Sequence, residues 1–251
     1  MLKDERLSRI VAAVHRQGRV SVAALLVELN VSEDTVRRDL DELASRGTVQ
    51  RVHGGAVLRP AVSPFAERML QDESSIRAGL AAEAATFARD GQILFLDSGT
   101  SVLAIARRLP AALHATVVTP SVPVAAFLAD HPTIEVQLVG GKLDKQAQST
   151  VGVTAVETIK RVRADLCFLG ICGLDAALGI SVLTADEAAV KRALISQAAE
   201  VVAIAEADKL GTADPYLVDD IRAITYLITD RSVTDATLAP YRAQGVQVLQ
   251  V

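Results

Sequence analysis

Aromatic residues are scarce in this sequence, at 3% of the chain, whereas half of all residues are hydrophobic. The hydrophobic core must therefore be built mainly from Ala, Val, Leu and Ile. Aliphatic side chains in this proportion favour a buried parallel sheet with helices on both faces, that is, an α/β fold. A chain of 251 residues can hold a small domain and a larger one.

Long hydrophobic runs are also missing, because Asp, Arg, Gly or Pro interrupts each one before it reaches the length of a membrane span. The N-terminus carries charged residues rather than a signal-peptide pattern, namely Lys3, Asp4, Glu5 and Arg6. We therefore expect a cytoplasmic protein with no membrane partner.

Only two cysteines are present, Cys167 and Cys172, in or beside the apolar run from Leu166 to Leu174. No histidine or second cysteine pair lies nearby in the sequence, so free thiols are favoured over a disulfide or a metal site. We expect neither a metal nor a cofactor.

The chain lacks the excess of positive charge that is typical of nucleic-acid-binding proteins, because its net charge is −4. The distribution is uneven, however. Residues 1–60 contain 10 Lys and Arg against 8 Asp and Glu, and the remainder contains 16 against 22. A mildly basic N-terminal segment on an acidic body is compatible with DNA contact confined to that segment.

The stretch from Asn30 to Leu43 predicts an amphipathic helix that Ser32 can cap. Its apolar stripe consists of Val36, Leu40 and Leu43. The exposed positions near its start include Thr35, Arg37 and Arg38. Such a helix fits the DNA major groove, where arginine can bind guanine or phosphate. Taken alone, the stretch could equally be a solvated helix.

The flanking sequence favours DNA binding. Residues 4–17 have helical hydrophobic spacing that ends at Gly18, and Ser21 can cap a second helix. A very short turn at Asn30-Val31 then leads into the third helix, which makes a helix-turn-helix.

A wing is expected after this motif. Two β-prone runs, 49–52 and 56–58, lie on either side of His53-Gly54-Gly55 and predict a two-stranded wing. Arg51 and His53 would then meet the DNA backbone or the minor groove. For His53, a turn position without any contact is an equal alternative.

A linker is expected at 59–73, where Pro60 and Pro64 stand, between a domain at 1–58 and a domain at 74–251. Beyond a helix from about Ser75 to Arg89, short apolar runs alternate with helical stretches. The predicted strands are 92–96, 115–118, 134–139, 165–169, 200–205 and 224–228. The predicted helices are 101–109, 121–130, 152–162, 185–198 and 235–243. This alternation predicts an α/β domain with a mostly parallel sheet, in which ligands bind beyond the carboxyl ends of the strands.

The first predicted strand of this domain ends in a polar loop, Asp97-Ser98-Gly99-Thr100-Ser101, directly before a helix. Small residues leave backbone N–H groups accessible, and the hydroxyls and the helix start add further donors. The loop can therefore hold a phosphate, although it is no Walker A motif. A plain strand-to-helix turn is the alternative.

Other polar residues follow the remaining strands and are candidates for the same site: Thr119, Ser121, Gly140, Gly141, Lys142, Asp175 and Lys209. Lys191 lies one helical turn after Glu187 and could reach the site, but an ion pair with Glu187 is favoured.

Two sets of motifs resemble the DeoR family of bacterial transcription regulators. In the N-terminal segment they are Thr35-Val36-Arg37-Arg38-Asp39-Leu40 and Arg51-Val52-His53-Gly54-Gly55-Ala56. In the larger domain they are Asp97 to Thr100, Thr119 to Ser121, Gly140-Gly141, Asp165 to Gly173, Glu187 to Lys191 and Ala205 to Gly211. The resemblance implies a winged helix-turn-helix, a larger domain similar to ribose-5-phosphate isomerase, and a phosphorylated sugar or related metabolite as effector.

The sequence departs from the family pattern at two places. Pro120 stands where the family usually has Asn, and Glu206 to Leu210 replaces a run similar to Asp-Ser-Ser-Lys-Phe. The added carboxylate of Asp208 and the lost aromatic ring at Leu210 indicate an altered pocket and an unusual effector.

The combined features predict a transcription regulator, most often a repressor of a carbohydrate operon, that binds double-stranded operator DNA as a homodimer or homotetramer. One alternative is a sugar-phosphate isomerase with a DNA-binding segment. It would need acids and bases among Asp97, Asp175, Glu206 and Asp208, and no nucleophile-and-base spacing joins them. A regulator that responds to a protein or to no ligand is the other alternative.

Overall fold

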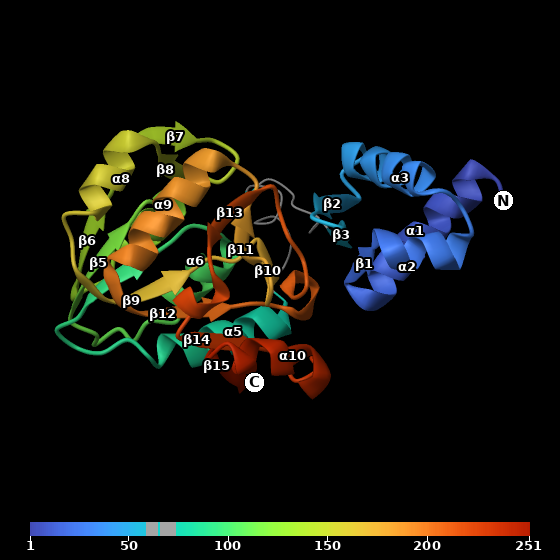
Figure 1. Ribbon diagram of the computed structural model, residues 1–251. Coiled ribbons are helices and arrows are strands. Elements are labelled where there is room, and N and C mark those ends of the chain that lie inside the picture. Colours follow the sequence, from blue (N-terminus) through green and yellow to red (C-terminus); the bar gives the residue numbers. More distant parts are fainter. Residues whose placement is uncertain (59–64, 66–73) are drawn as a thin grey trace.

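The computed structural model describes residues 1–58, 65 and 74–251 (Figure 1). We call residues 1–58 the head and residues 74–251 the body. All but one residue of the expected linker lie outside the described residues. The exception is Phe65, which is buried in a hydrophobic cluster of the body and donates its N–H to the Gln146 carbonyl at 2.9 Å.

The head contains the three predicted helices, α1 (Lys3–Gln17), α2 (Val22–Leu29) and α3 (Glu33–Ser45). The Ser21 hydroxyl caps α2, and Asn30 adopts the left-handed conformation in the tight turn to α3. Buried aliphatic residues from all three helices form one core. The helix-turn-helix prediction is therefore confirmed.

The predicted two-stranded wing is present, because the strands β2 (Val49–Val52) and β3 (Gly55–Leu58) pair as expected. A third strand was not predicted: β3 also pairs with β1 (Arg19–Ser21), so the sheet order is β1-β3-β2. A three-residue strand is too short to show a pattern in the sequence. The contact explains Gly55, because a Cβ there would lie 2.0 Å from the Val20 carbonyl oxygen.

The body is built around a seven-stranded sheet in the order β15-β14-β12-β9-β4-β5-β6, in which every pair is parallel. Its strands are β4 (Ile93–Leu96), β5 (Ala115–Thr119), β6 (Ile134–Leu138), β9 (Ala164–Leu169), β12 (Ala198–Ile204), β14 (Tyr226–Thr229) and β15 (Gln247–Gln250). The connecting helices are α5 (Ser75–Ala85), α6 (Thr100–Ala106), α7 (Val122–Leu128), α8 (Val153–Ile159), α9 (Ala185–Ser196) and α10 (Asp235–Ala243). The expected α/β fold with a parallel sheet is thus observed, with element ends shifted by a few residues.

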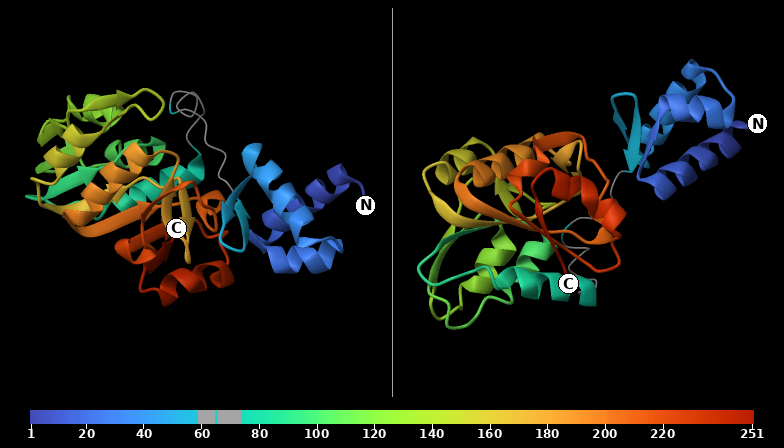
Figure 2. Two further views of the ribbon diagram at one scale, coloured as in Figure 1. Left: turned by 45° about the horizontal axis from the view of Figure 1, so that its top comes forward. Right: turned by 60° about the horizontal axis from the view of Figure 1, so that its bottom comes forward.

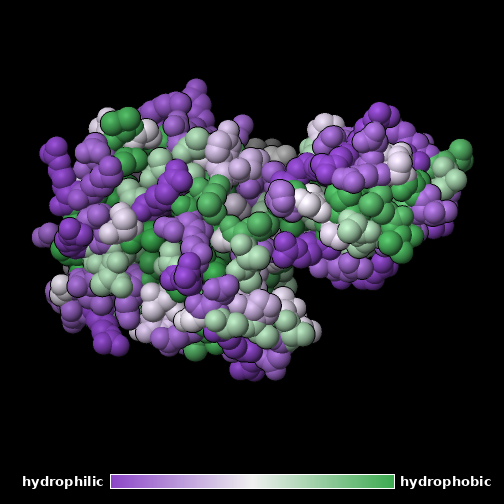
Figure 3. All heavy atoms as spheres, in the orientation of Figure 1, coloured by the Kyte–Doolittle hydropathy of each residue, from purple (hydrophilic) through white to green (hydrophobic). Residues whose placement is uncertain are grey.

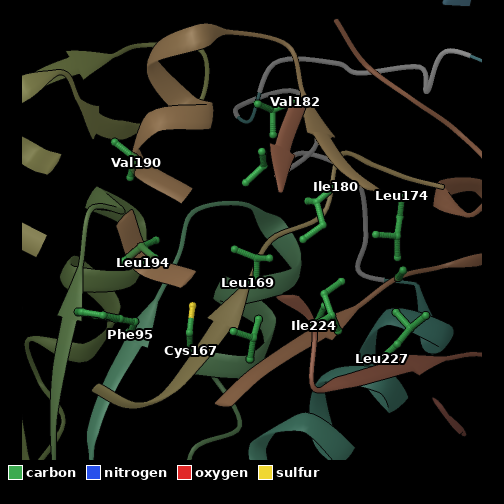
Figure 4. Packing of buried hydrophobic residues seen from close by; sticks show 14 of the residues in the cluster. Phe95, Cys167, Leu169, Leu174, Ile180, Val182, Val190, Leu194, Ile224 and Leu227 are labelled. Atoms are coloured by element: carbon green, nitrogen blue, oxygen red, sulfur yellow. The ribbon is translucent and has the colours of Figure 1, made fainter. Parts of the chain in front are cut away.

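Alternation along the strands creates two cores on opposite faces of this sheet. In β4, Leu94 and Leu96 belong to the cluster with α5, α6 and α7, whereas Phe95 belongs to the cluster with α8, α9 and α10. Figure 4 shows the second cluster, in which Phe95 and Cys167 lie beneath Val190 and Leu194 of α9. The two cysteines do not form a disulfide with each other; Cys167 is buried and Cys172 is half-buried.

Two small antiparallel units were not predicted. One is the sheet β10-β11-β13, formed by β10 (Gly173–Asp175), β11 (Gly179–Val182) and β13 (Tyr216–Asp219), and the other pairs β7 (Lys142–Asp144) with β8 (Ser149–Val151).

Figure 2 shows the head at one end of the body, with its strands turned towards the body.

Figure 3 shows hydrophilic residues around the edges of the visible face, and hydrophobic residues both across the middle of the body and over α1 and α2 of the head. Val27 of α2 is 85% exposed. Within the described part of the chain, no helix combines the length and the apolar character that crossing a membrane requires.

Candidate functional site

The helix α3 has the features of a DNA-reading helix. Ser32 is its N-cap and bonds both the N–H and the hydroxyl of Thr35, at 3.4 and 2.9 Å. The stripe Val36, Leu40 and Leu43 is buried in the head core. Arg37 and Arg38 are exposed, so α3 presents two guanidinium groups to solvent.

The two arginines differ in their surroundings. Arg37 forms an exposed i,i+4 ion pair with Glu33 at 2.5 Å, which engages its Nε and Nη2 groups. Arg38 forms no ion pair with any residue that the structure describes. Arg38 is therefore the group of α3 that is most readily available to DNA.

One important residue of α3 was missed in the sequence. Asp39 is only 2% exposed and accepts hydrogen bonds from both Nε and Nη2 of Arg6 in α1. This buried pair fixes α3 against α1. The signal was present, because Asp39 lies between Val36 and Leu40 on the inner side of the helix, where a carboxylate needs a partner.

The wing residues are placed differently from one another. Arg51 is half-buried, and its Nε pairs with Asp41 of α3 at 3.2 Å, so it joins the wing to the helix. His53 is exposed in the turn between β2 and β3. His53 is thus accessible to DNA, whereas Arg51 already has a structural partner.

In the body, a pocket lies at the carboxyl ends of β4 and β9. One wall is the predicted loop, Ser98 to Ser101, and the opposite wall is the segment Gly170 to Cys172, with Ala147, Glu187 and Lys191 completing the lining. Its cavity volume is about 40 Å³, which is room for a small anion, so the rest of a larger ligand would extend through the open mouth.

A buried ion pair forms the floor of this pocket. The Lys191 Nζ donates to the Asp97 carboxylate and, at 2.8 Å, to the Gly170 carbonyl, and Gly170 N–H donates to the same carboxylate at 2.9 Å. The pair with Glu187 that the spacing favoured is also present, at 3.7 Å. These contacts tie the two walls of the pocket and α9 together.

Burial and charge shift the pKa values here. Burial alone would lower the pKa of Lys191, but attraction by Asp97 and Glu187 outweighs it, so this pKa is raised and Lys191 stays cationic. Burial raises the pKa of the Glu187 carboxyl, and attraction by Lys191 offsets only part of that shift. The pocket therefore contains one cation, which Asp97 neutralises, and one carboxyl that protonates more readily than usual.

Two glycines shape the pocket. A Cβ on Gly170 would lie 2.3 Å from the Ser98 carbonyl oxygen, so the walls can approach only because this residue is glycine. Gly99 lines the pocket, has φ of +115°, and has nothing within 4 Å of where its Cβ would stand. A side chain at Gly99 would strain the backbone of the loop.

The structure brings together Asp97, Ser98, Gly99, Thr100, Ser101 and Lys191 of the predicted effector residues. Several others do not line this pocket. Thr119 accepts a hydrogen bond from the N–H of Ser121, which caps α7. Lys142 pairs with Asp186 at 3.3 Å, and Asp175 accepts two N–H groups in its own turn.

The remaining three candidates lie in loops outside the pocket. Gly140 and Gly141 are exposed between β6 and β7, and a Cβ on Gly141 would lie 2.7 Å from the Val151 carbonyl oxygen. Lys209 pairs with Asp208 at 3.0 Å in a short 3-10 turn. In the sequence, Ile171 and Cys172 were indicated only as part of the motif Asp165 to Gly173, and Glu187 only as a partner of Lys191 within the motif Glu187 to Lys191. Ala147 was not indicated as a lining residue.

Two family models match the chain and account for most of its length. The DeoR-like helix-turn-helix domain matches residues 6–60, and the DeoR C terminal sensor domain matches residues 73–231.

Full-length relatives agree with these models. The HTH-type transcriptional regulator GlpR of Haloferax volcanii is 34% identical over 252 residues, covering 99% of this chain and 98% of that protein. The HTH-type transcriptional repressor GlcR of Bacillus subtilis is 32% identical over 252 residues, covering 99% and 96%.

Among solved structures, ribose 5 phosphate isomerase A from Neisseria gonorrhoeae matches 53% of this chain and 52% of its own, at 13% identity and a TM-score of 0.40. A similarity of this size carries no argument, so the likeness to that isomerase stays an expectation. The helix-turn-helix of the head, the parallel sheet of the body, the two family models and the full-length relatives lead to one conclusion: this chain belongs to the DeoR family of transcription regulators.

Proposed function

We propose that this protein represses a carbohydrate operon by binding double-stranded operator DNA through α3, and that a phosphorylated sugar or related metabolite bound in the body modulates this binding. The proposed DNA contacts are Arg37, Arg38 and Thr35 on α3, with Ser32 at its start and His53 and Arg51 on the wing. We also propose that the protein acts in the cytoplasm as a homodimer or homotetramer, because paired reader helices fit spaced half-sites.

The observation that carries the effector proposal is the pocket between the loop Ser98 to Ser101 and the segment Gly170 to Cys172. A phosphate there would find backbone N–H groups and hydroxyls on one wall and Lys191 at the floor. Glu187, on the other side, suits the hydroxyl groups of a sugar or polyol, since a carboxylate accepts hydrogen bonds from hydroxyls.

We infer a regulator rather than an isomerase, because two of the candidate acids and bases have structural roles. Asp97 is buried and bonded to Lys191 and Gly170, and Asp175 accepts the N–H groups of its own turn. A third, Glu206, pairs with Arg77 of α5 at 2.7 Å. Groups held in this way are poorly placed to move protons of a substrate.

One experiment tests both halves of the proposal. Binding of the protein to the native promoter fragment is measured with and without each of four phosphates: glycerol 3-phosphate, glucose 6-phosphate, fructose 1-phosphate and inorganic phosphate. Binding of each phosphate to the protein alone is measured by isothermal titration calorimetry. Arg38→Ala should weaken operator binding by about 1–3 kcal/mol and leave phosphate binding unchanged. Gly99→Val should abolish phosphate binding and the response while operator binding survives.

The matched control is Arg9→Ala, since Arg9 forms an exposed i,i+4 ion pair in α1 like that of Arg37 in α3. Normal operator affinity in both Arg37→Ala and Arg38→Ala would remove α3 from DNA recognition. A normal response in Gly99→Val would remove the loop from effector binding, and turnover of a phosphate by the wild type would favour the isomerase.

A further inference from the structure

The head and the body meet through backbone pairing. Leu58, the last residue of β3, forms a parallel bridge with Thr212, and the N–H of Ala213 donates to the Leu58 carbonyl at 3.2 Å. Leu58 in turn donates its N–H to the carbonyl of Gly18, at the end of α1, at 3.1 Å. The segment Gly211 to Ala213, which we call the joint, thus touches the wing and, through it, the first helix of the head.

On its other side the joint is held to β10. The N–H of Gly211 donates to the Leu174 carbonyl at 2.8 Å. The Tyr241 hydroxyl, from α10, donates to the same carbonyl at 2.9 Å and accepts from Gly211 N–H at 3.1 Å. Tyr241 is only 2% exposed, and burial raises the pKa of its hydroxyl to about 12, so this group stays protonated and can donate.

The strand β10 begins directly after a wall of the effector pocket. Gly170 to Cys172 line the pocket, Gly173 starts β10, and Leu174 contacts the joint. Gly170 is also fixed to Asp97 and Lys191 on the pocket floor. Leu174 lies only two residues after Cys172, so we expect a displacement of this wall to move Leu174 as well.

We propose that the joint transmits effector occupancy to the head: a ligand that moves the segment Gly170 to Cys172 shifts β10 and changes the pairing of Ala213 with Leu58. The inference rests on the proposed function and adds its regulation. A ligand can shift the orientation of the head only if the two arrangements bind it differently, and contact between the pocket wall and the joint provides that difference.

The geometry around the joint suits a change in orientation. An open groove with a volume of about 290 Å³ lies beside it and is lined by Arg19 of the head and by Asp175, Gly211 and Tyr241 of the body. The head is thus held there by a narrow backbone contact with open space next to it. Such a contact can exist in a paired and an unpaired state, which a switch needs.

The test is Tyr241→Phe in the full-length chain, which removes the hydroxyl between Leu174 and Gly211 and keeps the ring. The control is Tyr226→Phe, since the Tyr226 hydroxyl contacts only Glu200, at 3.4 Å, among the described residues and lies away from the joint. The readout is the ratio of operator affinity with and without the phosphate that the wild type binds, taken from the panel above. Tyr241→Phe should reduce this ratio at least about threefold, while the affinity of the DNA-free protein for the phosphate stays unchanged. Tyr226→Phe should give the same ratio as the wild type.

A second measurement needs no phosphate. Amide hydrogen exchange of the wild type with and without the promoter fragment should show changed protection at Ala213 and in β10, because coupling between two sites is reciprocal. A wild-type ratio in Tyr241→Phe, or unchanged protection at both places when DNA is bound, overturns the role of the joint and leaves the proposed function standing. Absence of promoter binding by the wild type overturns both together.

Discussion

At the scale of single residues, the pair of Lys191 and Asp97 has the strongest structural role in the body. Both side chains are about 2% exposed; Lys191 is the only cation paired with Asp97 among the described residues, whereas Lys191 also pairs with Glu187. Removing one member of such a pair leaves a buried charge without its partner. The loss then exceeds what the pair itself contributes.

Lys191→Met should therefore lower the free energy of unfolding by about 3–5 kcal/mol, measured by urea denaturation. The double variant Lys191→Met with Asp97→Asn should recover a substantial part of that loss, because no uncompensated charge remains. A single variant as stable as the wild type would contradict this structural role of the pair.

Glu187 gives the pocket a pH dependence with a definite sign. Burial raises its pKa in the folded protein above that of the unfolded chain. Its protonated form thus stabilises the fold at low pH, and this contribution is lost as the pH rises through the raised pKa. As the pH rises from the unfolded-state pKa of Glu187 through its raised folded-state pKa, the free energy of unfolding of the wild type should fall relative to that of Glu187→Gln. Urea denaturation at several pH values measures this difference.

The same group affects binding of an anion. A phosphate near Glu187 favours protonation of the carboxyl, so phosphate affinity of the wild type should decrease as the pH rises, and less so in Glu187→Gln. The exposed Glu135→Gln serves as the control. Parallel pH profiles for all three proteins would show that Glu187 does not titrate in this range.

At the scale of elements, close backbone contacts decide the shape of the wing. Gly55→Ala places a Cβ 2.0 Å from the Val20 carbonyl oxygen, so β1 and β3 must separate. We expect lower stability of the head and weaker operator binding, seen by thermal unfolding and band shift. Gly79→Ala in α5, where nothing lies within 4 Å, is the matched change and should raise stability by about 0.5–1 kcal/mol.

The elements predicted from the sequence are those with a repeating hydrophobic pattern. The stripe Val36, Leu40 and Leu43 predicted α3, and the apolar runs predicted six of the seven parallel strands, all except β15. The units that were missed, β1, β7 with β8, and β10 with β11 and β13, have strands of three or four residues. The hairpins β7–β8 and β10–β11 pair locally, but their strands are too short to show a hydrophobic pattern. The strands β1 and β13 pair with partners far away in the chain, which no local pattern records.

The candidate site was predicted to a similar extent. The loop Ser98 to Ser101 was found because small and hydroxyl residues follow a strand directly. The opposite wall, with Ile171 and Cys172, carries no such polar signal, and it joins the site only because β9 lies beside β4 in the sheet.

At the scale of the whole molecule, Phe65 bears on where the body begins. It lies within the predicted linker, yet it is only 3% exposed and belongs to the same cluster as Leu80 and Ala84. A fragment of residues 59–251 should therefore be more stable than one of residues 74–251, by about 3–5 kcal/mol as for the loss of a buried phenylalanine. Phe65→Ala in the longer fragment should remove the difference, and equal stability of the two fragments would contradict the burial of Phe65.

The pairing of Leu58 with Thr212 and Ala213 also has a consequence for protein engineering. A chimaera that carries the head of another regulator on this body will inherit its DNA sequence preference from the new reader helix. Its inducibility, by contrast, will depend on whether the grafted wing ends in a strand that can pair with the joint. In a hybrid regulator, the residue at which the new head is joined to this body should therefore be chosen so that the last strand of the new wing can pair with Ala213, as β3 does here.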